Sequence, residues 1–242
     1  MLFFTFCFLI LPFFLPEVSA SDDIFTGLRF GDDGYSLISF QPDMSPLAEK
    51  FSFCVWINQR NSGNPTVFTY DATELVSWGY GHIILFENYD AFSSRMTLGQ
   101  WNQYCGSWSL ASRTFRAYFN GTLAGTLTTD SGRKLRTGGT LVLGDIWDTV
   151  VGGQRTNYHF AGEMYNLNMF AKELSGPEIA ELSENGICTT IPEKLQPYRV
   201  IKWEEVMELP RQGNVIDIRA SCRVSVNKQH SNLQLNSVIF TV

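Results

Sequence analysis

Hydrophobic and polar residues alternate along most of the chain after residue 25, in short runs separated by turn-forming residues. This period of two predicts β-strands, because successive side chains of a strand point to opposite faces. Residues 51–57, FSFCVWI, are apolar at both odd and even positions. A strand that is apolar on both faces belongs inside a packed structure, so we expect this segment at the centre of a sheet.

Residues 114–127, TFRAYFNGTLAGTL, predict a hairpin of two strands around Asn120-Gly121. Asn-Gly accepts the positive φ angles that a tight hairpin turn needs at both central positions. Residues 163–170, EMYNLNMF, alternate in the same way and predict a further strand.

Residues 174–186, LSGPEIAELSENG, have the signals of a helix instead. Ser175 is placed as the N-cap, and Glu178 three residues later completes a capping box. Pro177 suits the first helical turn. Gly186 is placed for the C-cap.

Many short strands with a single late helix indicate an all-β fold. We expect a two-sheet antiparallel jelly-roll β-sandwich with one short helix near the C-terminal end. From residue 211 the composition changes, with no aromatic residue before Phe240. The sequence therefore predicts a domain over residues 21–210 and a C-terminal extension over residues 211–242.

Composition and charge exclude few functions. The chain has 242 residues, 44% of them hydrophobic, and a formal net charge of −6 without blocks of like charge. No basic stripe interleaves with aromatic residues, so nothing favours a nucleic-acid partner. A mildly acidic, mixed surface favours solubility.

Residues 1–20, MLFFTFCFLILPFFLPEVSA, are apolar through Leu15 and end in Val18-Ser19-Ala20. Small side chains at the third-last and last positions fit signal-peptidase cleavage, so we expect a signal peptide and a secreted protein. The alternative is a membrane anchor, but Pro12 and Pro16 interrupt the run and it is short for a spanning helix. No later segment is long and apolar enough to span a bilayer.

Of five cysteines, Cys7 lies in the predicted signal peptide, which leaves Cys54, Cys105, Cys188 and Cys222. Four cysteines in an oxidising compartment predict two disulfides, and three pairings are possible. A zinc site is not expected, because no Cys-x-x-Cys pair occurs and no histidine lies at ligand-like spacing from a cysteine.

A family resemblance is carried by residues 101–108, WNQYCGSW, which follow the strand with Cys54 and precede the Asn-Gly hairpin. This order resembles the pentraxin family, whose signature reads His-x-Cys-x-Ser/Thr-Trp-x-Ser/Thr. Cys105, Ser107 and Trp108 match the signature, whereas Gln103 replaces the histidine and Leu110 the last Ser/Thr. Further matches follow in order: YFNG, GGTLVLG, GEMYNLNMF, the LSGPEIAEL helix, and VIKWEEVMEL (200–209), which looks like the family's closing strands.

The resemblance covers about residues 25–215 and implies a two-sheet jelly roll of the legume-lectin type. It also implies that Cys54 and Cys105 form the family's disulfide. Cys188 and Cys222 then remain, either to tie the C-terminal extension to the end of the helix or to pair with another chain.

Pentraxins hold two calcium ions, and the resemblance places most of those ligands on residues that cannot bind a metal. Asp148 matches the family's aspartate, but Ile146 and Trp147 stand where a Glu and a Gln are expected. On the earlier loop, Ala72-Thr73 stand where Asp-Asn is expected. Calcium needs six to eight oxygens, so we expect the family-type site to be degenerate. A weak, rearranged site would have to use Asp71, Glu74 and Asp145.

Two residues of the same loop are candidates for binding a ligand without metal. The Arg155 guanidinium beside Gly152-Gly153 can clamp an anion through two hydrogen bonds. The Trp147 indole can offer a stacking face, or it can fill the vacated metal pocket. For Arg155, the alternative is an ordinary surface residue.

An enzyme is not expected. Glycoside hydrolases of the same architecture need two carboxylates on one face, about 5 Å apart in retaining enzymes. Asp145 and Asp148 have an odd spacing, which points them to opposite faces of a strand. The remaining alternatives are a soluble lectin-like protein of innate-immune type that binds extracellular glycans or phosphate-bearing head groups, and an adhesion module of laminin-G type that binds proteins. The first is favoured, because no accompanying module is visible in the chain.

Two further expectations concern modification and assembly. Asn120-Gly121-Thr122 is a glycosylation sequon at an exposed hairpin tip, although a tight turn limits access to it. The family resemblance also implies a cyclic homo-oligomer, for which the sequence carries no interface motif.

Overall fold

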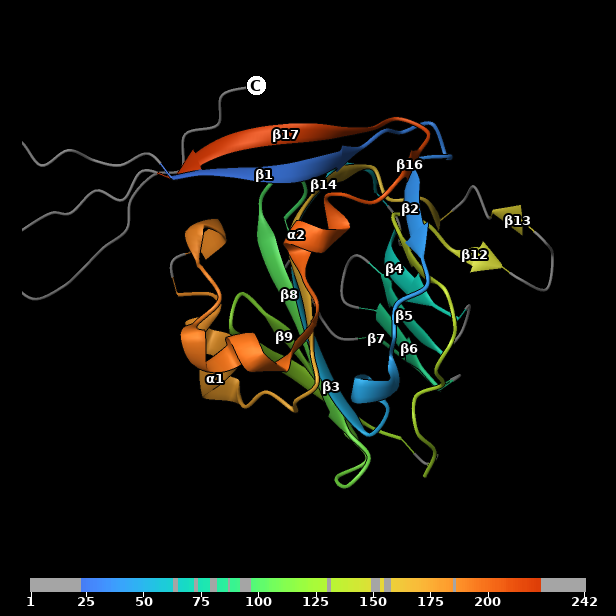
Figure 1. Cartoon of the computed structure of the whole chain (residues 1–242), viewed down its shortest axis with the longest axis vertical. Helices are drawn as coiled ribbons and strands as arrows, with labels where there is room; N and C mark the ends of the chain where they lie inside the picture. The colour runs from blue at the N-terminus through green and yellow to red at the C-terminus, as the bar shows by residue number, and fades with distance from the viewer. Residues whose placement is uncertain are drawn as a thin grey trace, which may run out of the picture.

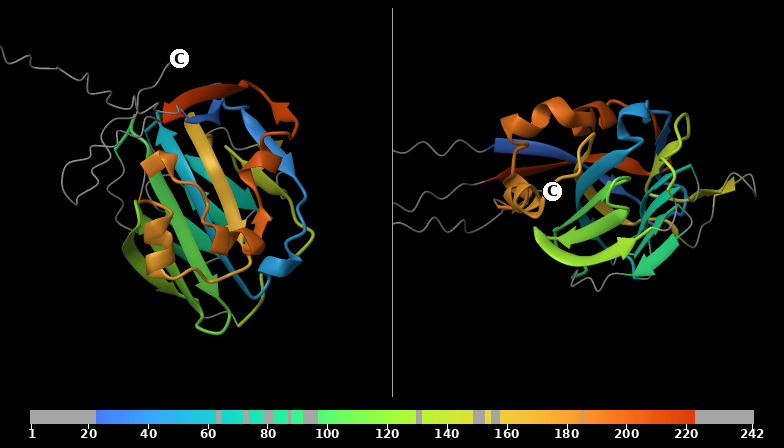
Figure 2. Two further views of the ribbon diagram at one scale, coloured as in Figure 1. Left: turned by 60° about the vertical axis from the view of Figure 1, so that its left-hand side comes forward. Right: turned by 90° about the horizontal axis from the view of Figure 1, so that it is seen from below.

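A computed structural model of the chain describes residues 23–62, 65–71, 74–78, 82–86, 88–91, 97–129, 132–148, 153–154, 158–184 and 186–222. Two antiparallel sheets pack face to face, and the helical segments between residues 176 and 198 lie against the outer face of the larger sheet (Figures 1 and 2). The predicted two-sheet sandwich is confirmed.

The larger sheet has the order β10-β9-β8-β3-β14-β1-β17, and the short strand β15 pairs with β14. Its strands are β1 (Asp23–Phe30), β3 (Lys50–Gln59), β8 (Asn102–Ser109), β9 (Thr114–Phe119), β10 (Thr122–Thr128), β14 (Gly162–Phe170), β15 (Arg199–Ile201) and β17 (Val215–Cys222).

The second sheet has the order β16-β2-β11-β4-β5-β6-β7, and β12 and β13 form a separate two-stranded ribbon. These strands are β2 (Leu37–Phe40), β4 (Thr66–Tyr70), β5 (Leu75–Trp78), β6 (His82–Leu85), β7 (Asn88–Ala91), β11 (Leu141–Leu143), β12 (Trp147–Asp148), β13 (Gly153–Gln154) and β16 (Arg211–Gln212). The α-helices are α1 (Gly176–Glu181) and α2 (Trp203–Val206), and 3-10 turns span Ser45–Leu47, Gly186–Cys188 and Glu193–Tyr198.

The core lies between the two sheets and is rich in aromatic rings. Phe53 of β3 contacts Phe68 of the facing sheet edge to face, with ring centroids 4.9 Å apart. Seven of the eight residues from Phe51 to Asn58 are buried, and Trp108 has no exposed surface. The prediction of a central strand over residues 51–57 is therefore confirmed. These residues are apolar at every position because both faces of β3 are buried.

The locally specified elements also match their predictions. Asn120 and Gly121 both have positive φ angles, 46° and 77°, at the turn between β9 and β10. The Ser175 N–H donates to the Glu178 carboxylate at 3.0 Å, as a capping box requires. The helix ends earlier than expected, with Leu182 as its C-cap. Gly186 instead starts the next 3-10 turn with a φ of 58°.

Two predictions about the C-terminal part are wrong. Residues 200–209 do not consist of strands only, because the short strand β15 is followed by the helix α2. The expectation of a single helix near the C-terminal end is therefore wrong as well. Trp203 and Val206 are both buried, and their spacing of three residues places them on one face of a helix.

The predicted boundary at residue 210 is also wrong, because both sheets continue beyond it. β16 pairs with β2 and β17 pairs with β1, eight residues against eight in antiparallel register. The described part of the predicted extension is therefore an integral part of the sandwich.

Cys54 and Cys105 form a disulfide across the neighbouring strands β3 and β8, as the resemblance implied. The bridge lies on the outer face of the larger sheet, where a second buried cluster covers it. That cluster consists of Tyr118, Phe170, Leu174, Ile179, Leu182 and Leu195.

Residues of the signature segment attach the α1 region to this face. The Gln103 side chain donates to the Leu182 carbonyl at 2.7 Å and accepts a hydrogen bond from Ser183. The Ser107 hydroxyl donates to the Leu174 carbonyl at 3.1 Å. The glutamine that replaces the family's histidine therefore has a structural role, because it fixes the end of the helix.

Cys188 is also disulfide-bonded. It packs against a buried cluster of Phe25, Trp56 and Ile187, and Phe25 belongs to the strand that pairs with β17. Cys222 ends β17, but its side chain lies outside the described residues. The pairing of Cys188 with Cys222 stays a prediction, which the common neighbourhood of β1 supports. Within the described residues, no helix has the length and apolar character needed to cross a bilayer.

The capping box gives a testable prediction for Glu178→Ala. Burial raises the pKa of Glu178, but hydrogen bonds from Lys172 and Ser175 outweigh it, so that the net pKa lies below its ordinary value. We expect the variant to lose about 1 kcal/mol of unfolding free energy at pH 7, the usual value of a lost cap.

Because the folded-state pKa is depressed, this contribution is present above the pKa of an unfolded glutamate and disappears as the pH falls through the folded-state pKa. Urea unfolding of both proteins at pH 7 and in mild acid measures it. A difference that is constant across this range would contradict the charged capping box.

Candidate functional site

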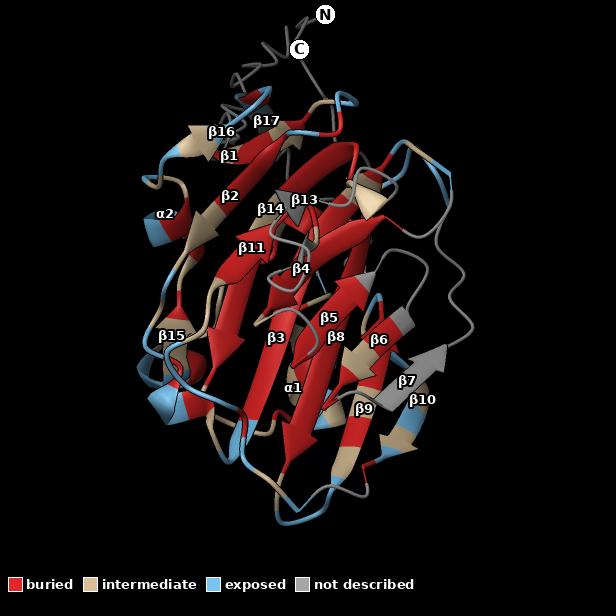
Figure 3. Cartoon of the chain, turned by 90° about the vertical axis from the view of Figure 1, so that its right-hand side faces the viewer, coloured by how far each residue is buried: buried red, intermediate tan, exposed pale blue. Residues whose placement is uncertain are grey.

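The outer face of the second sheet is the candidate binding face, because the loops with the predicted ligand residues leave from its central strands. Its floor is one row of side chains across five neighbouring strands. The row runs Ser39, Val142, Thr69, Val76 and Ile84. The three central members are almost completely buried, and Figure 3 shows β11, β4 and β5 buried along their described length.

The two loops start at opposite ends of the short β4–β11 pairing. The Asp71 N–H donates to the Thr140 carbonyl at 3.0 Å, before β11 begins. The Gly144 N–H donates to the Val67 carbonyl at 3.0 Å, after β11 has ended. The predicted candidates Glu74 and Asp145 are therefore separated by the length of the pairing, about 10 Å for three residues of strand.

Glu74 is a buried carboxylate that is already neutralised by arginine. Its side chain is 2% exposed. Arg133 Nη1 donates to both carboxylate oxygens, at 2.8 and 2.7 Å, and the Arg136 N–H donates to Oε1 at 2.9 Å. The Arg133 guanidinium also lies over the Phe86 ring, 4.7 Å from its centroid. A metal ion at Glu74 would have to displace Arg133.

The same cluster fixes the segment that leads into β11. The Tyr70 hydroxyl donates to the Arg136 carbonyl at 3.0 Å and accepts from the Gly139 N–H at 3.0 Å. Burial raises the pKa of this hydroxyl, while the hydrogen bond from Gly139 opposes the shift. Residues 133–139 are thus held against β4 by hydrogen bonds to the Tyr70 hydroxyl.

Asp145 lies at the other end of β11 and has no exposed surface. Its carboxylate accepts the Ile146 N–H at 2.6 Å, and its carbonyl accepts the Thr69 hydroxyl at 3.4 Å. Asp145 therefore shapes the start of the loop and attaches it to the floor, and it does not present a carboxylate to solvent.

The remaining candidates are only partly described. Trp147 and Asp148 form β12, which pairs with Gly153 and Gln154 of β13 in a ribbon beside the second sheet (Figure 1). The side chains of Trp147 and Asp148 lie outside the described residues, as do Arg155 and Ala72-Thr73. Asn120 is exposed, and its side-chain oxygen accepts the Gln103 N–H at 2.7 Å.

The described residues do not fit a pentraxin-type double calcium site. The oxygens of Glu74 are held by Arg133 and Arg136, and those of Asp145 are enclosed at the far end of the strand pair. In the part of the chain that the structure describes, no three histidine, cysteine or acidic side chains converge. Calcium requires several oxygens on one centre.

Sequence reasoning missed the arginines of this face. Arg133 is 59 residues from Glu74, and only the packing of the 132–139 segment against β4 and β5 brings them together. A faint signal existed, because Glu74 directly precedes the apolar pair Leu75-Val76, and a glutamate that is buried with such a strand requires a cationic partner.

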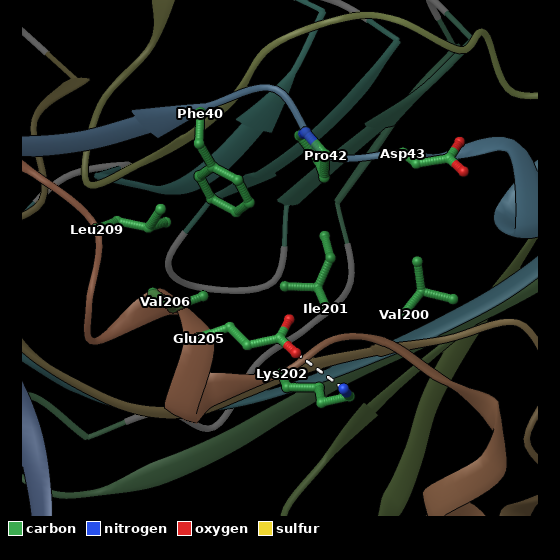
Figure 4. A pocket seen from close by; sticks show the side chains of 9 residues that line it. All are labelled: Phe40, Pro42, Asp43, Val200, Ile201, Lys202, Glu205, Val206 and Leu209. Carbon is green, nitrogen blue, oxygen red and sulfur yellow. Dashed lines mark hydrogen bonds and ion pairs between the residues drawn. The ribbon is translucent and has the colours of Figure 1, made fainter.

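A cavity of about 250 Å³ lies elsewhere, between the end of β2 and the β15–α2 segment (Figure 4). Its walls are apolar: Phe40, Pro42, Val200, Ile201, Val206 and Leu209. Asp43, Lys202 and Glu205 also line it, and Lys202 donates to Glu205 at 2.8 Å. Two carboxylates and one ammonium make the charged lining net negative, so the cavity does not suit an anionic ligand.

Comparison with known proteins agrees with this architecture. A sequence profile of the concanavalin A-like lectin/glucanases superfamily matches residues 30–180. Human neuronal pentraxin-1 is 29% identical over 175 residues, which is 66% of this chain and 38% of that protein. The chain thus spans about two fifths of the length of the curated relatives it matches.

Solved structures show the same fold. A heptameric SAP-like pentraxin from Limulus polyphemus superposes with a TM-score of 0.62 at 19% identity, covering 79% of this chain and 94% of that one. A putative carbohydrate-binding protein from Bacteroides ovatus superposes with a TM-score of 0.58 at 10% identity, covering 83% and 55%. The chain belongs to the concanavalin A-like lectin/glucanase superfamily, as a divergent pentraxin-like member.

Proposed function

We propose that this chain is a secreted, non-enzymatic, lectin-like protein that recognises glycans or anionic head groups without a pentraxin-type calcium site. The observation that carries the proposal is the arginine-neutralised Glu74 at the start of β5, in the second sheet of a pentraxin-like sandwich. Because Arg133 and Arg136 hold the Glu74 carboxylate, its negative charge is already balanced and needs no bound cation.

Recognition then relies on protein donors and on flat apolar surface. Arg155 supplies a guanidinium for a phosphate or carboxylate, and Trp147 supplies a stacking face for a sugar ring. Trp147 and Arg155 both follow Asp145 in the sequence, and Asp145 is buried and bonded to Thr69 of the sheet. We therefore assign the loop and the outer face of the second sheet to one binding face.

Retention on phosphoethanolamine-agarose tests the proposal. We expect the purified chain to be retained equally in calcium chloride and in excess chelator, because no metal bridges protein and head group. Arg155→Gln is expected to lower retention, whereas Lys194→Gln, a surface charge beside α1, is not.

Two results would contradict this function. Elution by chelator would indicate a calcium bridge of the family type. Failure to bind phosphoethanolamine, phosphocholine and an array of glycans in either buffer would favour a protein ligand.

A protein-binding adhesion module of laminin-G type is the second candidate, and the apolar cavity between β2 and α2 favours it. The cavity has room for one aliphatic side chain, and its carboxylates complement a neighbouring basic residue.

Secretion, glycosylation of Asn120 and a cyclic homo-oligomer complete the proposal of a lectin-like protein. Loss of mass on treatment with an N-glycosidase, absent in Asn120→Gln, tests the glycan.

A further inference from the structure

The cavity between β2 and the β15–α2 segment (Figure 4) carries an inference that is independent of the proposed lectin-like function. β2 belongs to the second sheet and β15 to the larger one, and no backbone pairing joins the two strands in the described part of the chain. Pro42, two residues after β2, has no N–H that could continue the hydrogen bonding of the strand. The cavity therefore opens at a seam where the margins of the two sheets separate.

The floor of the cavity is apolar and continuous with the core. Ile201 and Val206 are 3% and 1% exposed and belong to the main core cluster. Phe40, Val200 and Leu209 are partly buried and pack against the same cluster. The volume of about 250 Å³ exceeds the roughly 150 Å³ of an apolar cavity that accepts benzene. A hydrocarbon group therefore fits on this floor.

The rim of the cavity carries the charges. Asp43 is exposed on the wall that continues from β2, and Glu205, 59% exposed, lies on the opposite wall with Lys202 (Figure 4). Hydrogen bonds from the hydroxyl and the N–H of Ser45 lower the pKa of Asp43 below its ordinary value, so its carboxylate is charged at neutral pH. Two carboxylates and one ammonium leave the rim with a net negative charge, which attracts a cation and repels an anion.

We propose that this cavity is a binding site for a small aliphatic ammonium ion, a primary amine on a short unbranched hydrocarbon chain. The hydrocarbon lies on the floor of Ile201 and Val206, and the ammonium lies at the rim with Asp43 and Glu205. The difference in burial sets this direction, because an ammonium keeps most of its hydration at an exposed rim and would lose it on the floor. A fatty acid would place its carboxylate at the same acidic rim, and a sugar would leave its hydroxyls unpaired on the apolar floor.

Calorimetric titration with hexylammonium chloride tests the class of ligand. We expect a dissociation constant of about 1 mM, because about five CH₂ groups leave water. Each CH₂ group removed, in pentylammonium and then butylammonium, is expected to raise the constant about fourfold. Hexanol lacks the charge and is expected to bind about threefold more weakly. Hexanoate is expected to show no saturable binding, because the rim repels it.

Charge variants at the rim test the orientation of the ligand. Glu205→Gln and Asp43→Asn are each expected to weaken the binding of hexylammonium about threefold, as is usual for a charge pair that water reaches. Lys202→Gln is expected to strengthen it about threefold, because it removes a cation from the same rim. Glu208→Gln is the matched control, since Glu208 is an exposed carboxylate of the same segment that does not line the cavity. We expect Glu208→Gln to leave the constant unchanged.

Filling the cavity tests the location. Val200→Phe adds a ring from the partly buried wall of β15 and is expected to abolish saturable binding of hexylammonium. Leu209→Phe fills it from the other end of the segment and keeps the test valid where the first variant fails to fold, which urea unfolding shows. Both variants leave Trp147 and Arg155 unchanged, so retention on phosphoethanolamine-agarose should equal that of the parent. Failure of this site and failure of the proposed function are therefore distinguishable.

Four results would overturn the proposal. The first is the absence of saturable binding of hexylammonium. The second is an equal affinity for hexylammonium and hexanol, which would mean that the rim charges have no role. The third is binding that survives in both filling variants, which places it at another site. The fourth is binding of acetyl-leucyl-lysine amide without binding of hexylammonium, which would assign the cavity to a protein partner.

Discussion

Cys54→Ala/Cys105→Ala is expected to lower the free energy of unfolding by about 4 kcal/mol. The bridge closes a loop of 51 residues between two central strands, and removing it restores the chain entropy of the unfolded state. For a domain of this size the midpoint of thermal unfolding should fall by about 10 °C. Thermal and urea unfolding of both proteins measure the loss.

The change also weakens the support under α1, because Tyr118, Leu174 and Leu195 pack around the bridge. Limited proteolysis should therefore cut the 174–195 region of the double variant before the rest. A loss below about 1 kcal/mol, or equal protection of that region, would show that packing alone holds the helix on the sheet.

Arg133→Met is expected to cost about 2 kcal/mol, measured by urea unfolding at pH 7. It leaves the buried Glu74 with the Arg136 N–H and the more distant Arg136 side chain, 3.8 Å away. Breaking a fully buried ion pair costs about 3–5 kcal/mol, and we reduce this figure because Arg133 is 34% exposed. Methionine keeps an unbranched side chain of similar bulk beside Phe86 and removes the guanidinium that donates to Glu74 and lies over the ring, so the loss reports the charge.

Lys134→Met is the matched control, since Lys134 and its partner Glu49 are both more than 60% exposed. We expect a change within about 0.5 kcal/mol for this surface pair. The double variant Glu74→Gln/Arg133→Met should lose less than the sum of the single variants, because it removes both charges and leaves no buried charge unpaired. Additive losses would mean that Glu74 and Arg133 do not stabilise one another.

Much of the fold was predictable because its signals are local. The apolar run at 51–57, the Asn120-Gly121 turn and the Ser175–Glu178 capping box each specify their own conformation within a few residues. The family resemblance supplied the pairing of Cys54 with Cys105, which the cysteine count alone left open.

The wrong predictions have two causes, a long-range pairing that the sequence does not show and a local signal that was overlooked. β17 has no aromatic residue and was expected in an extension, yet its partner β1 lies at the other end of the chain. α2 was expected as a strand, although Trp203 and Val206 have helical spacing, a local signal that was overlooked. No local pattern links Glu74 to Arg133.

For the candidate site, the loss of calcium ligands stays a prediction from the sequence, whereas the partners of its buried carboxylates required the structure. Ile146, Trp147 and Ala72-Thr73 predicted the loss of calcium ligands from residue type alone. The partners of the two carboxylates became visible only in three dimensions, where Arg133 and Arg136 donate to Glu74 and the Ile146 N–H donates to Asp145.

Calorimetric titration of the purified chain with calcium chloride tests the central claim most directly. With Glu74 neutralised by arginine and Asp145 enclosed, we predict no calcium binding tighter than a dissociation constant of about 100 µM. Two ions bound per chain below that constant would contradict the account, since the face would then hold the paired calcium site that its described side chains do not form.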